Sequence, residues 1–176
     1  MSKDNLFPTL PDAARTWIYV AEPEIPTETW NVLRPAIDRF IRDWSSHRRP
    51  VIGDATLLYG RFLVLAAYVE GGDLSGCGID KSVHEIEALA AAHGIVWRSA
   101  LDVAWRDPSG TVRTGTRREF RSVIGSGSIH GATPVFDTSV VELGRLRSAG
   151  FELPASLSWH GQAFRIPQEP SGPILA

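Results

Sequence analysis

The first half of the chain alternates between strand-like and helix-like patterns of apolar residues. Residues 16–22 (TWIYVAE) are rich in β-branched and aromatic side chains, which predicts a strand. Residues 30–44 carry apolar side chains at intervals of three and four, as expected of a helix with one buried face. Thr27 is a natural cap for this helix. Pro35 predicts either a kink within the helix or a later start near Leu33.

Two further apolar runs follow, at 56–60 (TLLYG) and 61–69 (RFLVLAAYV). They meet at Tyr59-Gly60-Arg61, which predicts a tight turn. The second run is almost continuously apolar, which is typical of a central strand covered on both faces. We therefore expect two strands joined by a short turn.

A helix and a further strand complete this part of the chain. Ser82 and Glu85 form a Ser-x-x-Glu capping box, which predicts a helix over 83–93 that stops at Gly94. Residues 95–107 predict a strand or a pair of strands. The order strand, helix, strand, strand, helix, strand predicts an α+β fold with a ferredoxin-like βαββαβ antiparallel sheet and two helices.

The pattern changes near residue 105. An Asp-Pro-Ser-Gly turn predicts a hairpin, and a short capped helix, a short strand and another small helix are expected after it. We therefore expect a loose amino-terminal arm, a ferredoxin-like α+β sandwich, an appended hairpin with short helices sharing the same core, and a flexible tail. Their ranges are 1–15, 16–104, 105–166 and 167–176.

Composition and charge narrow the function classes. Of the 176 residues 43% are hydrophobic and 22% are charged, as in ordinary globular proteins. A single cysteine cannot form an intramolecular disulfide, so a reducing, cytoplasmic setting is expected. The longest apolar run, 62–69, is too short to cross a bilayer, and no apolar leader precedes it, so no membrane is expected as a partner. A formal net charge of −2 disfavours nucleic acid.

The stretch DLSGCGIDKSVHE at 73–85 is the most suggestive part of the chain. A glycine-rich loop followed by lysine, serine and a helix is the layout of a phosphate-binding loop, because N–H groups at a helix start attract anions. The spacing differs from a Walker A motif, since Lys81 follows Gly78 by only three residues and Asp80 adds negative charge. We expect an anionic ligand to be bound here by Ser75, Gly76, Gly78, Lys81, Ser82 and His160.

The letters LSGCG at 74–78 look like the Leu-Ser-Gly-Gly-Gln signature of ABC transporter ATPases. In that family the signature lies at a helix start and contacts the nucleotide of the opposing subunit. This chain has no Walker A motif upstream and no Walker B motif with its catalytic glutamate downstream. ATP hydrolysis is therefore not expected.

Several segments together resemble an uncharacterised family of small bacterial proteins whose members are often labelled "ABC transporter ATPase". The segments are RTWIYVAE, GRFLVLA, SGCGIDKSVHEIEAL, TPVFDTSV and SWH. The resemblance covers roughly residues 15–164. It implies a family name but no established activity.

The same stretch also holds the candidate catalytic residues, which are Cys77, Asp80, Lys81 and His84. A cysteine before a helix start, with a cation nearby, favours a reactive thiolate. Alternatively, the last three residues orient a substrate or water. Alternatively, neither residue is catalytic: Cys77 is a small, mostly buried residue in a tight turn, and His84 is a partly exposed helix residue.

The second half offers weaker candidates. A cluster of four basic residues suits an acidic partner, or is a solvated helix face: Arg113, Arg117, Arg118 and Arg121. Asp137 is a natural cap for a following helix, with a catalytic role at a strand end as the alternative. SWH at 158–160 either walls a pocket or packs against the domain. The five histidines show no metal-ligand spacing, so neither a metal nor a cofactor is expected.

Two hypotheses for the function follow. The first is a cytoplasmic binding or adaptor protein that recognises an anionic ligand or a protein partner through the 75–82 loop, or a protein through its sheet edge and arginine cluster. The second is a small hydrolase or group-transfer enzyme that uses Cys77, Asp80, Lys81 and His84. A homodimer is expected from fold analogy alone.

Overall fold

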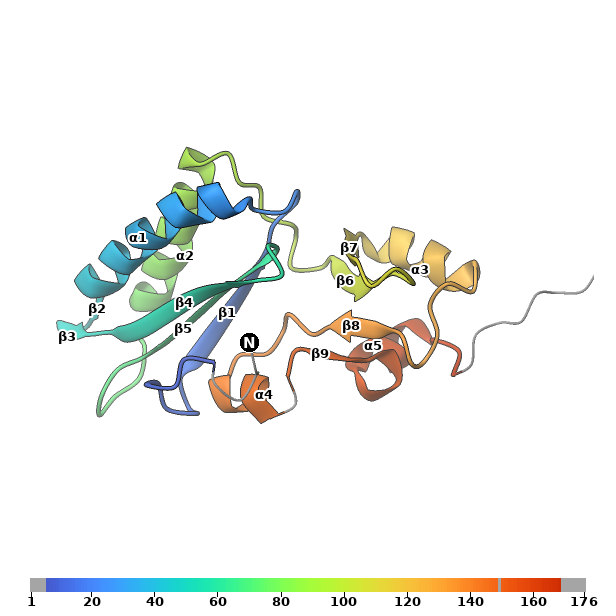
Figure 1. Ribbon diagram of the computed structural model, residues 1–176. Coiled ribbons are helices and arrows are strands. Elements are labelled where there is room, and N and C mark those ends of the chain that lie inside the picture. The colour runs from blue at the N-terminus through green and yellow to red at the C-terminus, as the bar shows by residue number, and fades with distance from the viewer. Residues whose placement is uncertain (1–5, 149, 169–176) are drawn as a thin grey trace, which may run out of the picture. The chain divides into compact units, whose positions relative to one another are not determined.

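The computed structural model describes residues 6–148 and 150–168 (Figure 1). The fold is mixed α+β, with antiparallel sheets and five α-helices in this part of the chain. The chain divides into two compact units. The first unit comprises Met1–Arg98 and Ser139–Ser148, and the second comprises Ser99–Thr138 and Ala149–Ala176. The sequence pattern gave no sign that 139–148 returns to the first unit.

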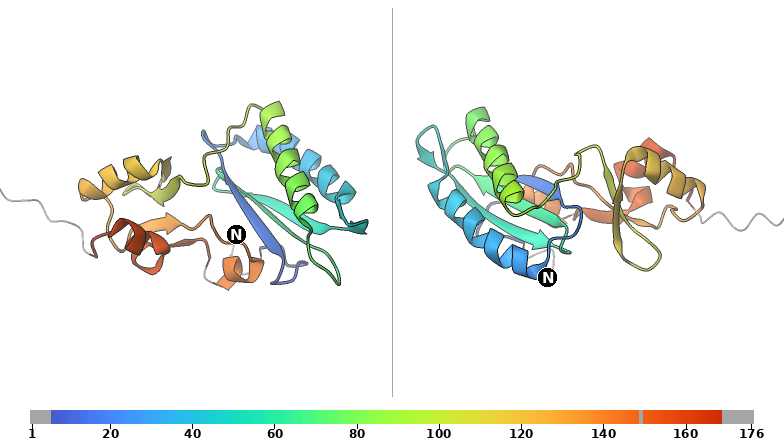
Figure 2. Two further views of the ribbon diagram at one scale, coloured as in Figure 1. Left: turned by 180° about the vertical axis from the view of Figure 1, so that it is seen from behind. Right: turned by 90° about the horizontal axis from the view of Figure 1, so that it is seen from above.

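The first unit is a three-stranded sheet with two long helices on one face (Figure 2). Strand β5 is central in the order β1-β5-β4, and both of its neighbours are antiparallel to it. The elements are β1 (Arg15–Val20), α1 (Thr27–Asp43), β2 (Ser45–Ser46), β3 (Arg49–Pro50), β4 (Ile52–Leu58), β5 (Phe62–Tyr68), α2 (Gly76–Ala92) and α4 (Leu143–Ser148).

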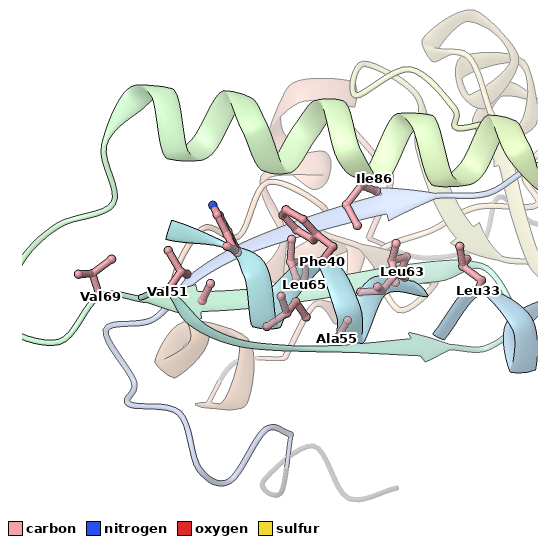
Figure 3. Close-up of a cluster of buried hydrophobic side chains, with 12 residues drawn as sticks. Leu33, Phe40, Val51, Ala55, Leu63, Leu65, Val69 and Ile86 are labelled. Carbon is pink, nitrogen blue, oxygen red and sulfur yellow. The ribbon is translucent and has the colours of Figure 1, made fainter. Parts of the chain in front are cut away.

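The core of this unit lies between the sheet and the two helices (Figure 3). Leu33 from α1, Leu63 and Leu65 from β5 and Ile86 from α2 are all at most 1% exposed. The continuously apolar run of β5 is buried from Phe62 to Ala67, which confirms the expected central strand. The predicted turn before it is also confirmed, since the Arg61 N–H donates to the Leu58 carbonyl at 3.0 Å.

Both long helices begin before the residues at which the sequence predicts their starts. Helix α1 begins at Thr27 and includes Pro35, whose side chain is exposed, so the later start was wrong; the cap position is Pro26 rather than Thr27. Helix α2 begins at Gly76 rather than after Ser82. The predicted capping box is therefore wrong: Ser82 lies inside the helix, and its buried hydroxyl donates to the Ile79 carbonyl at 2.7 Å.

The fourth strand of the expected ferredoxin-like sheet is not confirmed. Within residues 95–107, Trp97 forms a single antiparallel bridge with Ala21 at the end of β1. The longer strand of that segment, β6 (Val103–Arg106), pairs instead with strands of the second unit. The coarser prediction of an α+β fold with antiparallel pairing is confirmed.

The second unit is a four-stranded antiparallel sheet in the order β7-β6-β8-β9, with two helices. The predicted hairpin is confirmed as β6–β7, and the predicted short helix as α3, where Thr116 and Glu119 form a complete capping box. Phe120 is 0% exposed in the core of this unit. The remaining elements are β7 (Val112–Gly115), α3 (Arg117–Gly125), β8 (Pro134–Phe136), β9 (Glu152–Pro154), the 3-10 turn η2 (Ala155–Leu157) and α5 (Trp159–Phe164).

Residues 6–14, expected as part of a loose arm, are fixed to the first unit. Leu6, Phe7 and Leu10 are buried. The Arg147 guanidinium on α4 donates to the carbonyl oxygens of all three residues, at 2.7 to 3.1 Å. In the described ranges, no helix combines the length and the apolar character needed to cross a membrane.

Candidate functional site

The start of α2 is the centre of the loop that the sequence singled out. The Ser75 hydroxyl caps the helix by accepting from the Gly78 N–H at 3.1 Å. Gly76 and Cys77 are exposed, and over residues 6–148 and 150–168 their N–H groups have no hydrogen-bond partner. The first two amide donors of a 17-residue helix therefore face solvent, as an anion-binding helix start requires.

Gly78 is a glycine because α2 packs closely on the segment that follows α1. The Trp44 indole N–H donates to the Gly78 carbonyl at 3.0 Å. A Cβ atom at position 78 would lie 3.2 Å from Ser46 Oγ. Ser46 Oγ in turn lies 2.9 Å from Ser75 Oγ and accepts from the Ser75 N–H at 3.0 Å. The helix start is thus held against β2 by a short hydroxyl network.

A basic hairpin lies against the same loop. Its turn residues His47 and Arg48 are exposed and have positive φ angles of 50° and 65°. Arg49 donates to the Gly71 carbonyl at 2.9 Å, and a Cβ atom at Gly72 would lie 2.9 Å from the Arg49 guanidinium. Sequence analysis missed this hairpin, although the letters SHRRP at 46–50 are the most basic run in the first unit.

A cavity of about 300 Å³ borders the loop at Gly72, Asp73 and Leu74. Arg15 contributes the basic side chain of its wall and Asp73 the acidic one, while Gly72, Leu74 and Ala67 supply small and apolar surface. The Arg15 guanidinium lies 5.4 Å from the centre of the Trp17 ring. In the part of the chain that the structure describes, Arg15 forms no ion pair.

The four candidate catalytic residues share one exposed face of α2. Cys77, Asp80, Lys81 and His84 are spaced i, i+3, i+4 and i+7, and all four are exposed. The His84 Nδ1–H donates to the Asp80 carbonyl at 2.8 Å. Lys81 also lines a second hollow, of about 340 Å³, between α1 and α2. The early helix start, which the sequence did not reveal, is what aligns these side chains.

His160, expected beside this loop, belongs to the second unit and lies in a buried polar cluster there. Ser158 Oγ lies 2.7 Å from the His160 Nδ1. The Trp159 indole N–H donates to Asp137 Oδ1 at 3.1 Å, so Asp137 holds a side chain of α5. The prediction that Asp137 caps the following helix is wrong, because α4 begins only at Leu143.

Burial controls the protonation of His160. His160 is 2% exposed, and burial lowers its pKa to about 4. The Asp137 carboxylate opposes this change in pKa, and the positive charge of Arg117 adds to it. Ser158 Oγ also accepts from the His160 backbone N–H, so this one hydroxyl contacts both the backbone and the ring of His160.

The predicted arginine cluster is divided between β7 and α3. Arg113 on β7 pairs with Asp107 at 2.7 Å, and this contact, after the Ser109 hydroxyl, lowers the pKa of Asp107 to about 2. The three arginines of α3 are exposed and form no ion pair with any described residue: Arg117, Arg118 and Arg121. The Arg121 guanidinium lies 5.2 Å from the centre of the Phe164 ring.

Among the residues that the structure describes, no group of three or more His, Cys, Asp or Glu side chains could hold a metal ion. No family model matches the chain, and no curated protein and no solved structure matches it either. The functional proposals therefore depend on the geometry of the two units alone.

Proposed function

We propose that the protein is a binding or adaptor protein that takes a small anionic ligand beside the loop 71–78 of the first unit. The observation that carries the proposal is the cavity of about 300 Å³ bordered by this loop and by Arg15. A guanidinium without a carboxylate partner at the wall of a hollow is a natural anchor for a carboxylate or a phosphate.

The charges around the loop support an anionic ligand. Arg49 lies against Gly71 and Gly72, and the unbonded N–H groups of Gly76 and Cys77 begin α2 a few residues later. Positive side chains and helix-start amides act in the same direction on an anion.

Asp73 restricts the class of ligand. Its carboxylate lines the same cavity as Arg15 and repels a bare anion. A ligand that carries an amino or hydroxyl donor next to its acidic group satisfies both side chains. We therefore propose amino acids, hydroxy acids or sugar phosphates as the class of ligand, in preference to inorganic phosphate.

The experiment is a titration of the protein with glycine, aspartate, lactate, glucose 6-phosphate and inorganic phosphate, followed by melting temperature and by ¹H–¹⁵N NMR. A ligand that binds the folded state raises the melting temperature. We expect the rise to be lost in Arg15→Gln and kept in Arg42→Gln, an exposed arginine of α1 that is not part of this cavity. No rise at millimolar concentration of any member, or an equal rise in both variants, contradicts the proposal.

A second candidate is a small hydrolase or group-transfer enzyme built on the exposed face of α2. The observation that favours it is the i, i+3, i+4, i+7 spacing of Cys77, Asp80, Lys81 and His84 on that face. Hydrolysis of p-nitrophenyl acetate tests this candidate: a burst of p-nitrophenol that disappears in both Cys77→Ser and His84→Gln supports it. A burst that survives His84→Gln reports only an accessible thiol and excludes the enzyme.

We also propose that the first unit is a ferredoxin-like sandwich whose fourth strand is reduced to a bridge. The order β1-β5-β4 and the bridge between Ala21 and Trp97 support this reading. Membership of the resembling bacterial family, a cytoplasmic setting and a homodimer remain proposals. Sedimentation of the full chain tests the homodimer directly.

A further inference from the structure

The second unit presents exposed arginines on α3 and a half-exposed tryptophan on α5. The two helices pack through Phe120, whose ring centre lies 4.9 Å from that of Phe164 and 6.3 Å from that of His160. We define the α3–α5 surface by five residues that are exposed on these helices and on the turn before α5. They are Arg117, Arg118, Arg121, Leu157 and Trp159.

Trp159 is held rigidly although it is 40% exposed. Its ring stacks on the His160 ring with centres 3.8 Å apart and an interplanar angle of 25°. Its indole N–H is bonded to Asp137, a residue only 4% exposed, and the His160 ring is itself fixed by Ser158. An exposed aromatic ring that is already immobile loses little conformational entropy when a partner covers it.

The arginines of α3 form no ion pair with any residue that the structure describes. The only acidic residue of the helix, Glu119, accepts from both the N–H and the hydroxyl of Thr116 in the capping box. Arg121 lies over the Phe164 ring of α5, and Arg117, spaced i, i+4 from Arg121, lies on the same side of α3. The cationic side of α3 therefore borders the helix that carries Trp159.

We propose that the α3–α5 surface is a docking site for an acidic segment of another protein. The acidic side chains of that segment pair with Arg117 and Arg121, and an aromatic or aliphatic side chain packs on Trp159 and on Leu157, which is 75% exposed. Tryptophan and arginine are the residue types that most often carry the binding energy of protein interfaces. This proposal concerns the second unit and does not depend on the anion site of the first.

The composition of the α3–α5 surface favours a protein over a nucleic acid as the occupant. The surface presents three arginines, whereas affinity for nucleic acid grows with the number of phosphates neutralised by lysine and arginine. Leu157 also suits an aliphatic anchor, while single-stranded nucleic acid stacks its bases on aromatic rings.

The test begins with a random peptide library displayed on phage and selected on the full-length protein. We expect enrichment of peptides that combine aspartate or glutamate with tryptophan, phenylalanine or leucine. The enriched peptides, labelled with fluorescein, are then measured by fluorescence polarisation against the wild type, Arg117→Gln/Arg121→Gln and Trp159→Ala. Arg42→Gln, on α1 of the first unit, is the control for the loss of an exposed arginine outside the α3–α5 surface. Labelled oligo(dT) is measured against the same four proteins.

We expect a loss of affinity of about tenfold or more in the double arginine variant and in Trp159→Ala, because losing one hot-spot side chain costs more than about 1.4 kcal/mol. Affinity should also fall with added salt and be unchanged in Arg42→Gln. Near-UV circular dichroism is the control that tests whether the double arginine variant is folded. The proposal is overturned by a selection that enriches nothing or enriches basic peptides, by equal affinity in the arginine variant, or by oligo(dT) binding tighter than every peptide and requiring the same arginines.

Discussion

The protonation of His160 gives the sharpest test of the buried cluster behind Trp159. The ring is 2% exposed, and Ser158 Oγ lies 2.7 Å from its Nδ1. Burial lowers its pKa to about 4. The Asp137 carboxylate acts in the opposite direction, and the positive charge of Arg117 acts in the same direction as burial. We predict that His160 is neutral in the folded protein throughout the neutral and weakly acidic range.

The effect on stability follows from the protons bound by each state. The ordinary histidine pKa is 6.5, and in the folded state it is about 4. Between these values the unfolded chain binds a proton at position 160 and the folded protein does not, so the free energy of unfolding falls as the pH falls from 6.5 toward 4. At about 1.36 kcal/mol for each unit of pKa difference, the loss between pH 7.5 and 4.5 is about 2.5 kcal/mol.

The assay combines NMR and denaturation. The carbon-bound ring protons of each histidine, followed against pH, report the pKa directly, and guanidinium unfolding curves at several pH values report the free energy. His160→Gln should remove about 2.5 kcal/mol of the pH-dependent loss, although it lowers stability at every pH. Arg117→Gln should raise the pKa of His160 and Asp137→Asn should lower it further. A His160 resonance that titrates near 6.5 in the folded protein refutes the reasoning.

Three further predictions concern stability: the substitutions at Phe120, Gly76 and Gly78 are measured by urea unfolding, and the one at Arg147 is measured by hydrogen exchange. Phe120→Ala should cost about 3–5 kcal/mol, because the ring is 0% exposed, and a cost below about 1 kcal/mol contradicts the packing of α3 on α5. Arg147→Met should release residues 6–14, seen as lost amide protection there, and unchanged protection contradicts the role of its hydrogen bonds. Gly76→Ala should stabilise the protein by up to about 1 kcal/mol, since nothing lies within 4 Å of the added methyl group. Gly78→Ala should destabilise it, and equal effects of the two substitutions contradict the close packing at position 78.

The elements that the sequence predicts well are those specified by neighbouring residues. The turn at Tyr59-Gly60-Arg61 and the capping box of Thr116 and Glu119 each need only a few adjacent positions. The start of α2 is different, because glycines read locally as a loop. Position 78 is a glycine because Ser46 approaches it closely, and that contact spans more than thirty positions of the chain. The Ser75 cap is a local signal for this helix start, whereas the close packing at position 78 is not.

The same distinction applies to the candidate sites. The loop at 73–85 was identified from its composition, but its basic surroundings come from Arg15 and Arg49, which reach it only through the fold. Asp137 has the right letters for a helix cap, yet its carboxylate is bonded to Trp159, 22 positions later. The arginines of α3 were visible in the sequence, whereas the fixed aromatic ring beside their helix was not.

The edge of the first sheet bears on where a partner can bind. Strand β4 is an edge strand, and an open edge invites pairing with another chain. Here the Ala55 N–H donates to Asp54 Oδ1 at 2.7 Å, and its carbonyl accepts from the Arg34 guanidinium. Arg34 also pairs with Asp54 and Asp38, at 2.8 and 2.7 Å. An added strand would have to break these hydrogen bonds at the middle of β4, which disfavours the pairing of another chain along this edge.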